Sequence, residues 1–296
     1  MRFLNFLSNY RTPFGDTFWN LITRLGEGTT IVVILCIVYW CINKKLGKIL
    51  GYILFISSFL VQGLKIGFGV ARPWIIDPNF KAVDIALKKA TGYSFPSGHV
   101  QSSTSIFMGL AFYFRSKFLK IFLILIPISV CFSRMYLGVH TPKDVIVAFI
   151  LTTIIAFIII KYTKKYSRYQ RIELMMIAVL LGVLLLGYTF ILYTRGNIEI
   201  KYLIDSSKVI GAGFGFVLGD YLEANFVKFR VRTIRIWEQV FKILFGLLGM
   251  GLLDKFFKLL NNLLGFDALL IYGLKYFILI FWIVYLWPLI FKKILK

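Results

Sequence analysis

Long apolar runs separated by short basic loops recur along this chain. The longer runs reach the length of about 18 residues that a helix needs to cross a bilayer core of roughly 30 Å. Composition agrees, because 59% of the 296 residues are hydrophobic and 16% are charged, against about a quarter charged in soluble domains. These features exclude a soluble globular enzyme and a disordered chain. We predict an all-α fold, a polytopic transmembrane helical bundle.

The apolar runs predict about nine membrane-spanning helices. Residues 1–27 are too broken by polar side chains for a span, and we expect them to form an interfacial amphipathic segment. A cleaved signal peptide is the less favoured alternative, since no small-residue cleavage site follows the short apolar stretch. The predicted spans cover residues 29–42, 50–68, 100–114, 119–136, 145–162, 174–193, 209–222, 240–253 and 269–291.

The formal net charge of +22 is interpreted as membrane topology. In a soluble protein it would suggest nucleic acid, but here Lys and Arg cluster in every second loop, as in residues 44–48, 115–120 and 161–171. Such loops belong on the cytoplasmic side. We therefore expect an outside N-terminus, a cytoplasmic C-terminus and extracytoplasmic loops at 71–99 and 134–144, with no nucleic-acid partner. Abundant Lys, Ile and Phe favour a bacterial cell membrane.

Neither cysteines nor glycines indicate a cofactor site. Cys36, Cys41 and Cys131 lie in apolar segments without metal-ligand spacing. Glycines at 211, 215 and 219 recur on one helix face, which indicates close packing between helices or a possible homodimer contact rather than a nucleotide-binding loop.

Three polar clusters stand at predicted outer ends of spans, where buried charge is costly unless it serves a site. One runs from Lys65 to Arg72 and Pro73, one is Pro-Ser-Gly-His at 96–99, and one runs from Ser133 to Asp144. Any one of their cations alone would be interpreted as reaching for lipid phosphates. Together, Lys65, Arg72 and Arg134 predict a nest for a phosphoryl group.

The second cluster predicts a helix start that binds an anion. Ser97 is a natural N-cap, and we expect its hydroxyl and the amide of Gly98 to donate hydrogen bonds to phosphate oxygens. His99 would then lie beside the bound group and protonate the leaving oxygen as a general acid.

The third cluster predicts a nucleophile. Thr141 and Pro142 read as an N-cap and first helical residue, which puts Asp144 in the first turn. A hydrogen bond from one ring N–H of His140 to the carboxylate of Asp144 would leave the other nitrogen free to attack phosphorus. Asp144 would cap its own helix under either role. Because His140 must be neutral and His99 protonated, we expect a bell-shaped pH dependence.

The pattern resembles the phosphatidic acid phosphatase type 2 superfamily, which includes glucose-6-phosphatase and vanadium-dependent haloperoxidases. The resemblance covers about residues 28–165. The matching positions are Lys65, Arg72 and Pro73, then residues 96–99, then Ser133, Arg134, His140 and Asp144.

The resemblance implies that His140 is the nucleophile, Asp144 its orienting group and His99 the general acid. Phosphate ligands would be Lys65, Arg72, Ser97, Gly98 and Arg134, with no metal and no cofactor. The expected organisation is a phosphatase core at 28–170 followed by additional transmembrane helices at 171–296. Nine spans and an outside N-terminus are similar to the glucose-6-phosphatase and sphingosine-phosphate phosphatase branches.

The expected substrate is a lipid phosphate or diphosphate of undecaprenyl diphosphate, phosphatidic acid, phosphatidylglycerol phosphate or long-chain-base phosphate type. Trp74 and Phe80, between the first two motifs, are candidates for holding its chain. The alternatives are a water-soluble sugar phosphate, a haloperoxidase reaction, and a non-catalytic lipid transporter or scaffold.

Overall fold

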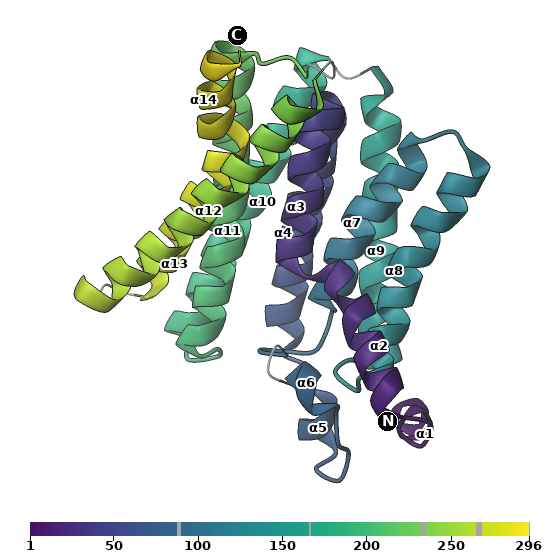
Figure 1. Ribbon diagram of the computed structural model, residues 1–296. Helices are drawn as coiled ribbons and strands as arrows, with labels where there is room; N and C mark the ends of the chain where they lie inside the picture. Colours follow the sequence, from purple (N-terminus) through teal and green to yellow (C-terminus); the bar gives the residue numbers. More distant parts are fainter. Residues whose placement is uncertain (88–89, 166, 232–234, 265–267, 296) are drawn as a thin grey trace. The chain divides into compact units, whose positions relative to one another are not determined.

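The computed structural model describes residues 1–87, 90–165, 167–231, 235–264 and 268–295 (Figure 1). All regular structure within these ranges is helical, without any strand. The prediction of an all-α fold is therefore confirmed for these residues. Two compact units are built from interleaved parts of the chain, residues 1–32 with 60–164 and residues 33–59 with 165–296.

Helices form over all nine predicted spans, but a count of nine crossings is not confirmed. In the described ranges, five segments are long and apolar enough to cross a membrane: Lys44–Ile76, Lys117–Tyr136, Pro142–Tyr162, Arg168–Thr194 and Leu269–Ile294. A sixth candidate is the pair Pro13–Gly26 and Gly28–Ile42, bent by 51°. The helix α7 (Gly98–Tyr113) has only 16 residues, and α11 (Ile200–Leu222) and α12 (Ile236–Leu264) are interrupted by charged side chains.

The first unit contains the three motifs. Its long helices are α7, α8 (Lys117–Tyr136) and α9 (Pro142–Tyr162), joined by short loops and packed on one another. The amphipathic α2 (Pro13–Thr23) packs on α8, and a short 3-10 turn, η1 (Arg24–Gly26), contacts α7. Three shorter helices, α1 (Arg2–Ser8), α5 (Pro73–Ile76) and α6 (Asp84–Leu87), lie near the motif-bearing loops.

The second unit is organised around α11. It packs against α10 (Arg168–Thr194) and, most extensively, against α13 (Ala268–Phe281). The C-terminal chain continues through a π-helical turn, η5 (Trp282–Leu286), into α14 (Trp287–Ile294). Two helices, α3 (Gly28–Ile37) and α4 (Lys44–Phe68), contribute residues to both units. Short π-helical turns follow α3 at η2 (Val38–Ile42) and α11 at η4 (Glu223–Val227), and a 3-10 turn, η3 (Thr163–Lys165), follows α9.

The glycine face of α11 is covered within the chain. A Cβ atom at Gly211 or Gly215 would collide with the backbone carbonyl of Gly273 or Phe277 on α13, and one at Gly219 would press on Val284. Backbones approach this closely only where side chains are absent. The predicted packing role of these glycines is confirmed, and α13 of the same chain occupies the face considered for a dimer.

A buried ion network joins α4 to the end of α11. The ammonium of Lys48 lies 2.5 Å from Asp220 Oδ1 and 2.7 Å from Glu223 Oε2, and that of Lys44 lies 2.6 Å from Glu223 Oε1. Tyr52 donates a 2.6 Å hydrogen bond to Asp220 Oδ2. The sequence pattern assigned both lysines to a cytoplasmic loop, and this is corrected: they begin α4, and Lys48 is buried because two carboxylates neutralise its environment.

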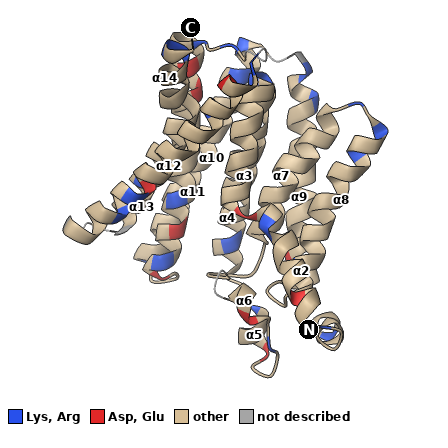
Figure 2. Cartoon of the chain, in the orientation of Figure 1, with Lys and Arg blue, Asp and Glu red and all other residues tan. Residues whose placement is uncertain are grey.

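Most other charges stand near helix ends, and long apolar stretches separate them (Figure 2). The apolar window of α4 is 72% buried, whereas those of α8, α9 and α10 are only 28–33% buried. Helices that leave apolar side chains outward over such lengths require a lipid environment. The protein is therefore embedded in a membrane.

Candidate active site

The first motif lies where α4 ends and α5 begins. Gly69 follows α4 with a φ of +54°, a left-handed conformation that glycine adopts readily. Arg72 precedes Pro73 in extended conformation, as the sequence predicts. Its side chain is buried and donates to the carbonyls of Thr91, Gly92 and Val139 at 2.8 to 3.0 Å. This guanidinium therefore ties the segment before the second motif to the turn before His140.

Lys65 lies one turn before the end of α4. Its Nζ donates a 3.1 Å hydrogen bond to the carbonyl of Tyr93. Because Arg72 binds the neighbouring carbonyls of Thr91 and Gly92, both cations of the first motif converge on residues 91–93.

The second motif begins α7 at the predicted residue. Ser97 is the N-cap, but its hydroxyl makes no capping bond; it is buried without a hydrogen-bond partner among the described residues. A Cβ at Gly98 would meet nothing within 4 Å, so the backbone amides there border open space. His99 lies half-buried in the first turn, and its backbone carbonyl lies against Gly26 of η1.

The third motif contributes a buried cation from the end of α8. Arg134 Nη1 donates to Thr23 Oγ1 at 3.1 Å, while its Nε is buried without a hydrogen-bond partner in the described part of the chain. Ser133 beside it donates to Val130 O within the helix at 2.8 Å. Gly138, with a φ of +75°, reverses the chain so that His140 follows within six residues of Arg134.

His140 is buried between a cation and an acid. Its Nε2 lies 2.9 Å from Arg72 Nη1, and its Nδ1 lies 3.6 Å from Asp144 Oδ2. The predicted direct hydrogen bond from His140 to Asp144 is thus replaced by a different arrangement. Ser94 Oγ donates to Asp144 Oδ2 at 2.6 Å and lies 3.4 Å from His140 Nδ1. The same oxygen of Asp144 also accepts from the backbone amide of Thr141 at 2.7 Å, because Asp144 caps its own helix.

The polarity of these contacts fixes the tautomer of His140. A guanidinium only donates hydrogen bonds, so Nε2 must present its lone pair to Arg72 and Nδ1 carries the proton. Burial lowers the pKa of His140 well below 6.5, and the positive charges of Arg72, Arg134, Lys65 and His99 lower it further. The imidazole is therefore neutral at physiological pH, with its lone pair on the side of the cations.

Three motif cations stand near the carboxylates of Asp144 and of Glu27, which acts on Arg134, so positive charges outnumber negative ones, as suits an oxyanion. In the described ranges no three His, Cys, Asp or Glu side chains come together in a metal-binding group. The arrangement can hold a phosphoryl group by cations and amides while a neutral imidazole faces it.

The structure gathers Arg72, His140 and Asp144 into direct contact and places Lys65 on the carbonyl of Tyr93, next to Ser94. The two candidates for a lipid pocket, Trp74 and Phe80, belong to an apolar cluster. Phe80 is buried in a cluster with Leu4 and Leu137, and Trp74 packs on that cluster with its ring 5.9 Å from Arg72 Cζ.

Two contacts of the site were missed by the sequence analysis, those of Ser94 and Thr23. Ser94 stands two residues before the second motif, and its hydroxyl type was the only available signal. Thr23 lies in the N-terminal segment, 111 residues from Arg134, and nothing in the local sequence indicates the contact.

Two family models match the chain. Residues 46–168 match the family described as the PAP2 superfamily, and residues 207–295 match the PAP2 superfamily phosphatase, transmembrane extension. A probable sphingosine-1-phosphate phosphatase of Dictyostelium discoideum is 32% identical over 51% of this chain and 39% of its own length. Matches to this and two mammalian sphingosine-1-phosphate phosphatases span less than half the length of those relatives.

Bacterial proteins also match. The phosphatidylglycerophosphatase B of Bacillus subtilis is 26% identical over 54% of this chain and 81% of its own length. A crystal structure of a transmembrane PAP2 type phosphatidylglycerolphosphate phosphatase from Bacillus subtilis is 21% identical with a TM-score of 0.48, over 57% of this chain and 86% of that one. The two family matches include all three motifs and the C-terminal helices, and the chain belongs to the PAP2 superfamily.

Proposed function

We propose that this protein is an integral membrane phosphatase that hydrolyses a lipid phosphate or diphosphate through a phosphohistidine intermediate, without a metal, at the extracytoplasmic face. The observation that carries the proposal is the environment of His140: a neutral, buried imidazole whose Nε2 lone pair faces Arg72 and whose Nδ1 faces Ser94 and Asp144. A nucleophile held by a third group in this way is the arrangement that covalent catalysis requires.

Phosphate binding would use the cations and amides around His140. Lys65, Arg72 and Arg134 neutralise the phosphoryl oxygens, and the hydroxyl of Ser97 and the amide of Gly98 complete the set. The unpartnered Ser97 hydroxyl and Arg134 Nε support this assignment, because buried polar atoms are normally hydrogen-bonded. Arg72 would pass its hydrogen bond from Nε2 to a phosphoryl oxygen, which exposes the lone pair.

The reaction would proceed in two displacements. Nε2 of His140 forms a bond to phosphorus, the bond from phosphorus to the leaving oxygen breaks with its electron pair, and His99 gives that oxygen a proton. Water, whose proton returns to His99, then attacks the phosphohistidine, releases phosphate and restores His140. Asp144, with Ser94 between, would stabilise the positive charge that develops on the imidazole.

A lipid substrate is supported by the surroundings of the site. Helices α8 and α9 expose apolar side chains over most of their length, so the motif-bearing loops lie at the ends of lipid-facing helices. Relatives named as phosphatases of sphingosine-1-phosphate, phosphatidylglycerophosphate and lipid A all act on phosphates attached to lipids. Trp74 and the exposed Ile75 and Ile76 stand next to Arg72 and are candidates to hold the chain.

The test is phosphate release by the purified protein in detergent with EDTA. Substrates are undecaprenyl diphosphate, phosphatidic acid, a long-chain-base phosphate and glucose 6-phosphate, each beside the variant His140→Ala. We expect turnover of a lipid that the variant loses while its thermal unfolding stays cooperative. Activity on the sugar phosphate alone would indicate a water-soluble substrate. Lipid turnover that survives in His140→Ala would refute the mechanism.

The role of His99 has its own control. Protonation of the leaving oxygen matters for an alkyl phosphate and little for a nitrophenyl phosphate, whose leaving group is stable as an anion. His99→Ala should therefore lose far more activity on the alkyl ester. Equal losses on both esters would remove His99 from the general-acid role.

A further inference from the structure

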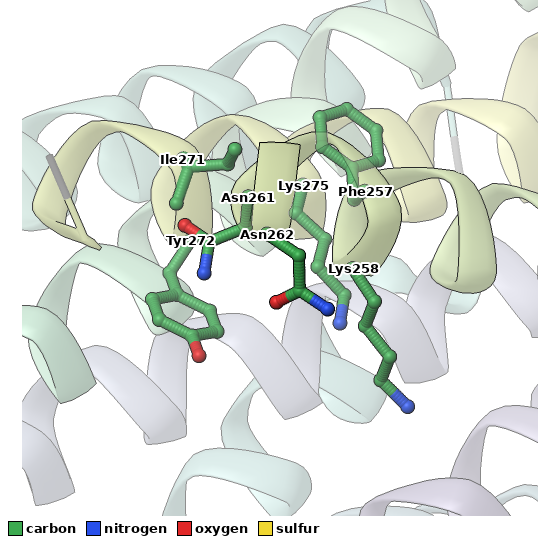
Figure 3. A pocket seen from close by; sticks show the side chains of 7 residues that line it. All are labelled: Phe257, Lys258, Asn261, Asn262, Ile271, Tyr272 and Lys275. Carbon is green, nitrogen blue, oxygen red and sulfur yellow. The ribbon is translucent and has the colours of Figure 1, made fainter. Parts of the chain in front are cut away.

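A polar cavity lies in the C-terminal unit, between α12 and α13 (Figure 3). Its volume is about 220 Å³. The polar lining comes from Lys258, Asn261 and Asn262 of α12 and from Tyr272 and Lys275 of α13. In Figure 3 the amides of both asparagines and the ammonium of Lys275 face the same space. None of these side chains belongs to the three motifs.

The charges around this cavity are not balanced. Asp254 accepts from both lysines, with its oxygens 2.8 Å from Lys258 Nζ and 2.5 Å from Lys275 Nζ. A third ammonium, that of Lys208, lies 5.0 Å from the centre of the Tyr272 ring and pairs with Asp205 at 2.8 Å. Three ammonium groups against two carboxylates leave one net positive charge.

The donors on the cavity wall are matched to an anion. Two ammonium groups, two amide groups and a phenol provide hydrogen-bond donors, and Lys275 is held in place by burial. A phosphate group uses several donors and a positive charge at once. The volume, below the roughly 300–1,000 Å³ of pockets for drug-sized ligands, is suited to a head group and not to a whole lipid.

The walls also indicate where the rest of such a ligand would lie. Phe257 and Ile271 give the cavity an apolar side. On the same turns, Leu259 and Leu263 of α12 and Leu270 of α13 are 57%, 71% and 71% exposed. Exposed leucines beside basic side chains at helix ends are typical of the boundary between head groups and acyl chains.

We infer that this cavity binds the phosphate of an anionic phospholipid head group, with Lys258 and Lys275 as the cationic ligands and Asn261 and Asn262 as neutral donors. The site is separate from the motif residues and needs no hydrolysis. Its occupant would be a resident membrane lipid that holds α12 against α13.

The test measures lipid binding in the His140→Ala background, so that turnover does not interfere. Native mass spectrometry gives the Kd of phosphatidylglycerol, a phosphodiester, with phosphatidylcholine and inorganic phosphate as comparison ligands. The variant Lys258→Gln removes one exposed ligand and should raise the Kd about tenfold, the effect of losing one charge-assisted hydrogen bond. Lys255→Gln, the same change on an exposed position of α12 outside the cavity, should leave the Kd unchanged.

A second variant tests the sign of the effect. Asp254→Asn removes the carboxylate that both lysines share, so it should lower the Kd for phosphatidylglycerol even where it lowers stability. A purely structural cluster would instead bind less lipid in both variants. Equal Kd values for Lys258→Gln and Lys255→Gln would overturn the inference. Binding of inorganic phosphate with the same dependence on Lys258, but no preference for phosphatidylglycerol over phosphatidylcholine, would overturn the assignment to a lipid.

Discussion

Removing the charge of Glu223 should destabilise the protein more than removing an exposed glutamate. Its two carboxylate oxygens bind Lys44 and Lys48 at 2.6 and 2.7 Å, and one of them also accepts from the backbone amide of Phe229 at 3.0 Å. Glu223 has no exposed surface and Lys48 is 4% exposed. In Glu223→Gln, the buried ammonium of Lys48 would keep Asp220 as its charged partner, and the part-buried ammonium of Lys44 would lose its ion pair.

The magnitude follows from these distances. At an effective dielectric constant of about 20, two unit charges 2.7 Å apart attract by about 6 kcal/mol. Most of this attraction offsets the cost of taking both charges out of water, so loss of one partner from a buried pair typically costs about 3–5 kcal/mol. We expect Glu223→Gln to lower the free energy of unfolding by that amount.

The assay is reversible unfolding in mixed micelles with increasing sodium dodecyl sulfate, followed by circular dichroism. The matched control is Glu199→Gln, whose partner Lys201 lies 2.8 Å away with both side chains more than half exposed; solvent screens such a pair, so it contributes little to stability. The charge-balanced double variant Lys44→Met with Glu223→Gln should recover part of the loss. If the free energies of unfolding of Glu223→Gln and Glu199→Gln differ by less than about 1 kcal/mol, the network does not stabilise the protein as described.

Three further predictions concern the site and the packing of α11. Since the pKa of His140 is lowered and only neutral His140 attacks, the acidic limb of the pH profile of kcat/KM should lie below pH 6.5. Lys65→Met removes one of the positive charges that lower this pKa, so it should move the limb to higher pH. A limb at or above pH 6.5 in the unaltered protein contradicts this reasoning. Ser94→Ala should lower kcat about tenfold with little change in KM, as expected for a hydrogen bond to the Asp144 carboxylate, and unchanged kcat would exclude a positioning role. Gly215→Ala should cost about 1–3 kcal/mol of unfolding free energy by overpacking, measured beside Gly187→Ala, where nothing lies within 4 Å and no loss is expected.

Local patterns in the sequence predicted the parts of the fold that depend on local chemistry. The apolar runs correctly placed the long helices, and Thr141 before Pro142 correctly gave the start of α9. Ser97 gave the start of α7 for the same reason, since N-cap and first-turn preferences act within a few residues. The two histidines led to the candidate site because both fall within short polar clusters.

Contacts between distant segments could not be read in the same way. Ser94 lies between His140 and Asp144 only because the loop before α7 folds onto the start of α9, through a 3.1 Å bond from the Ser97 amide to the Asp144 carbonyl. Lys48 looked like an ordinary loop cation, since its counter-charges on α11 and η4 are far along the chain. No local periodicity carries that information.

The ion network also affects the order in which the helices reach their final positions in the membrane. Lys48 is synthesised 175 residues before Glu223, so the start of α4 is made before its counter-charges exist. An unpaired ammonium is costly inside a membrane, which favours keeping this end of α4 at the water interface until α11 has been inserted. A chain shortened after residue 168 would retain the three motifs but never receive those carboxylates. We therefore expect the C-terminal helices to stabilise the start of α4, the helix that also carries Lys65.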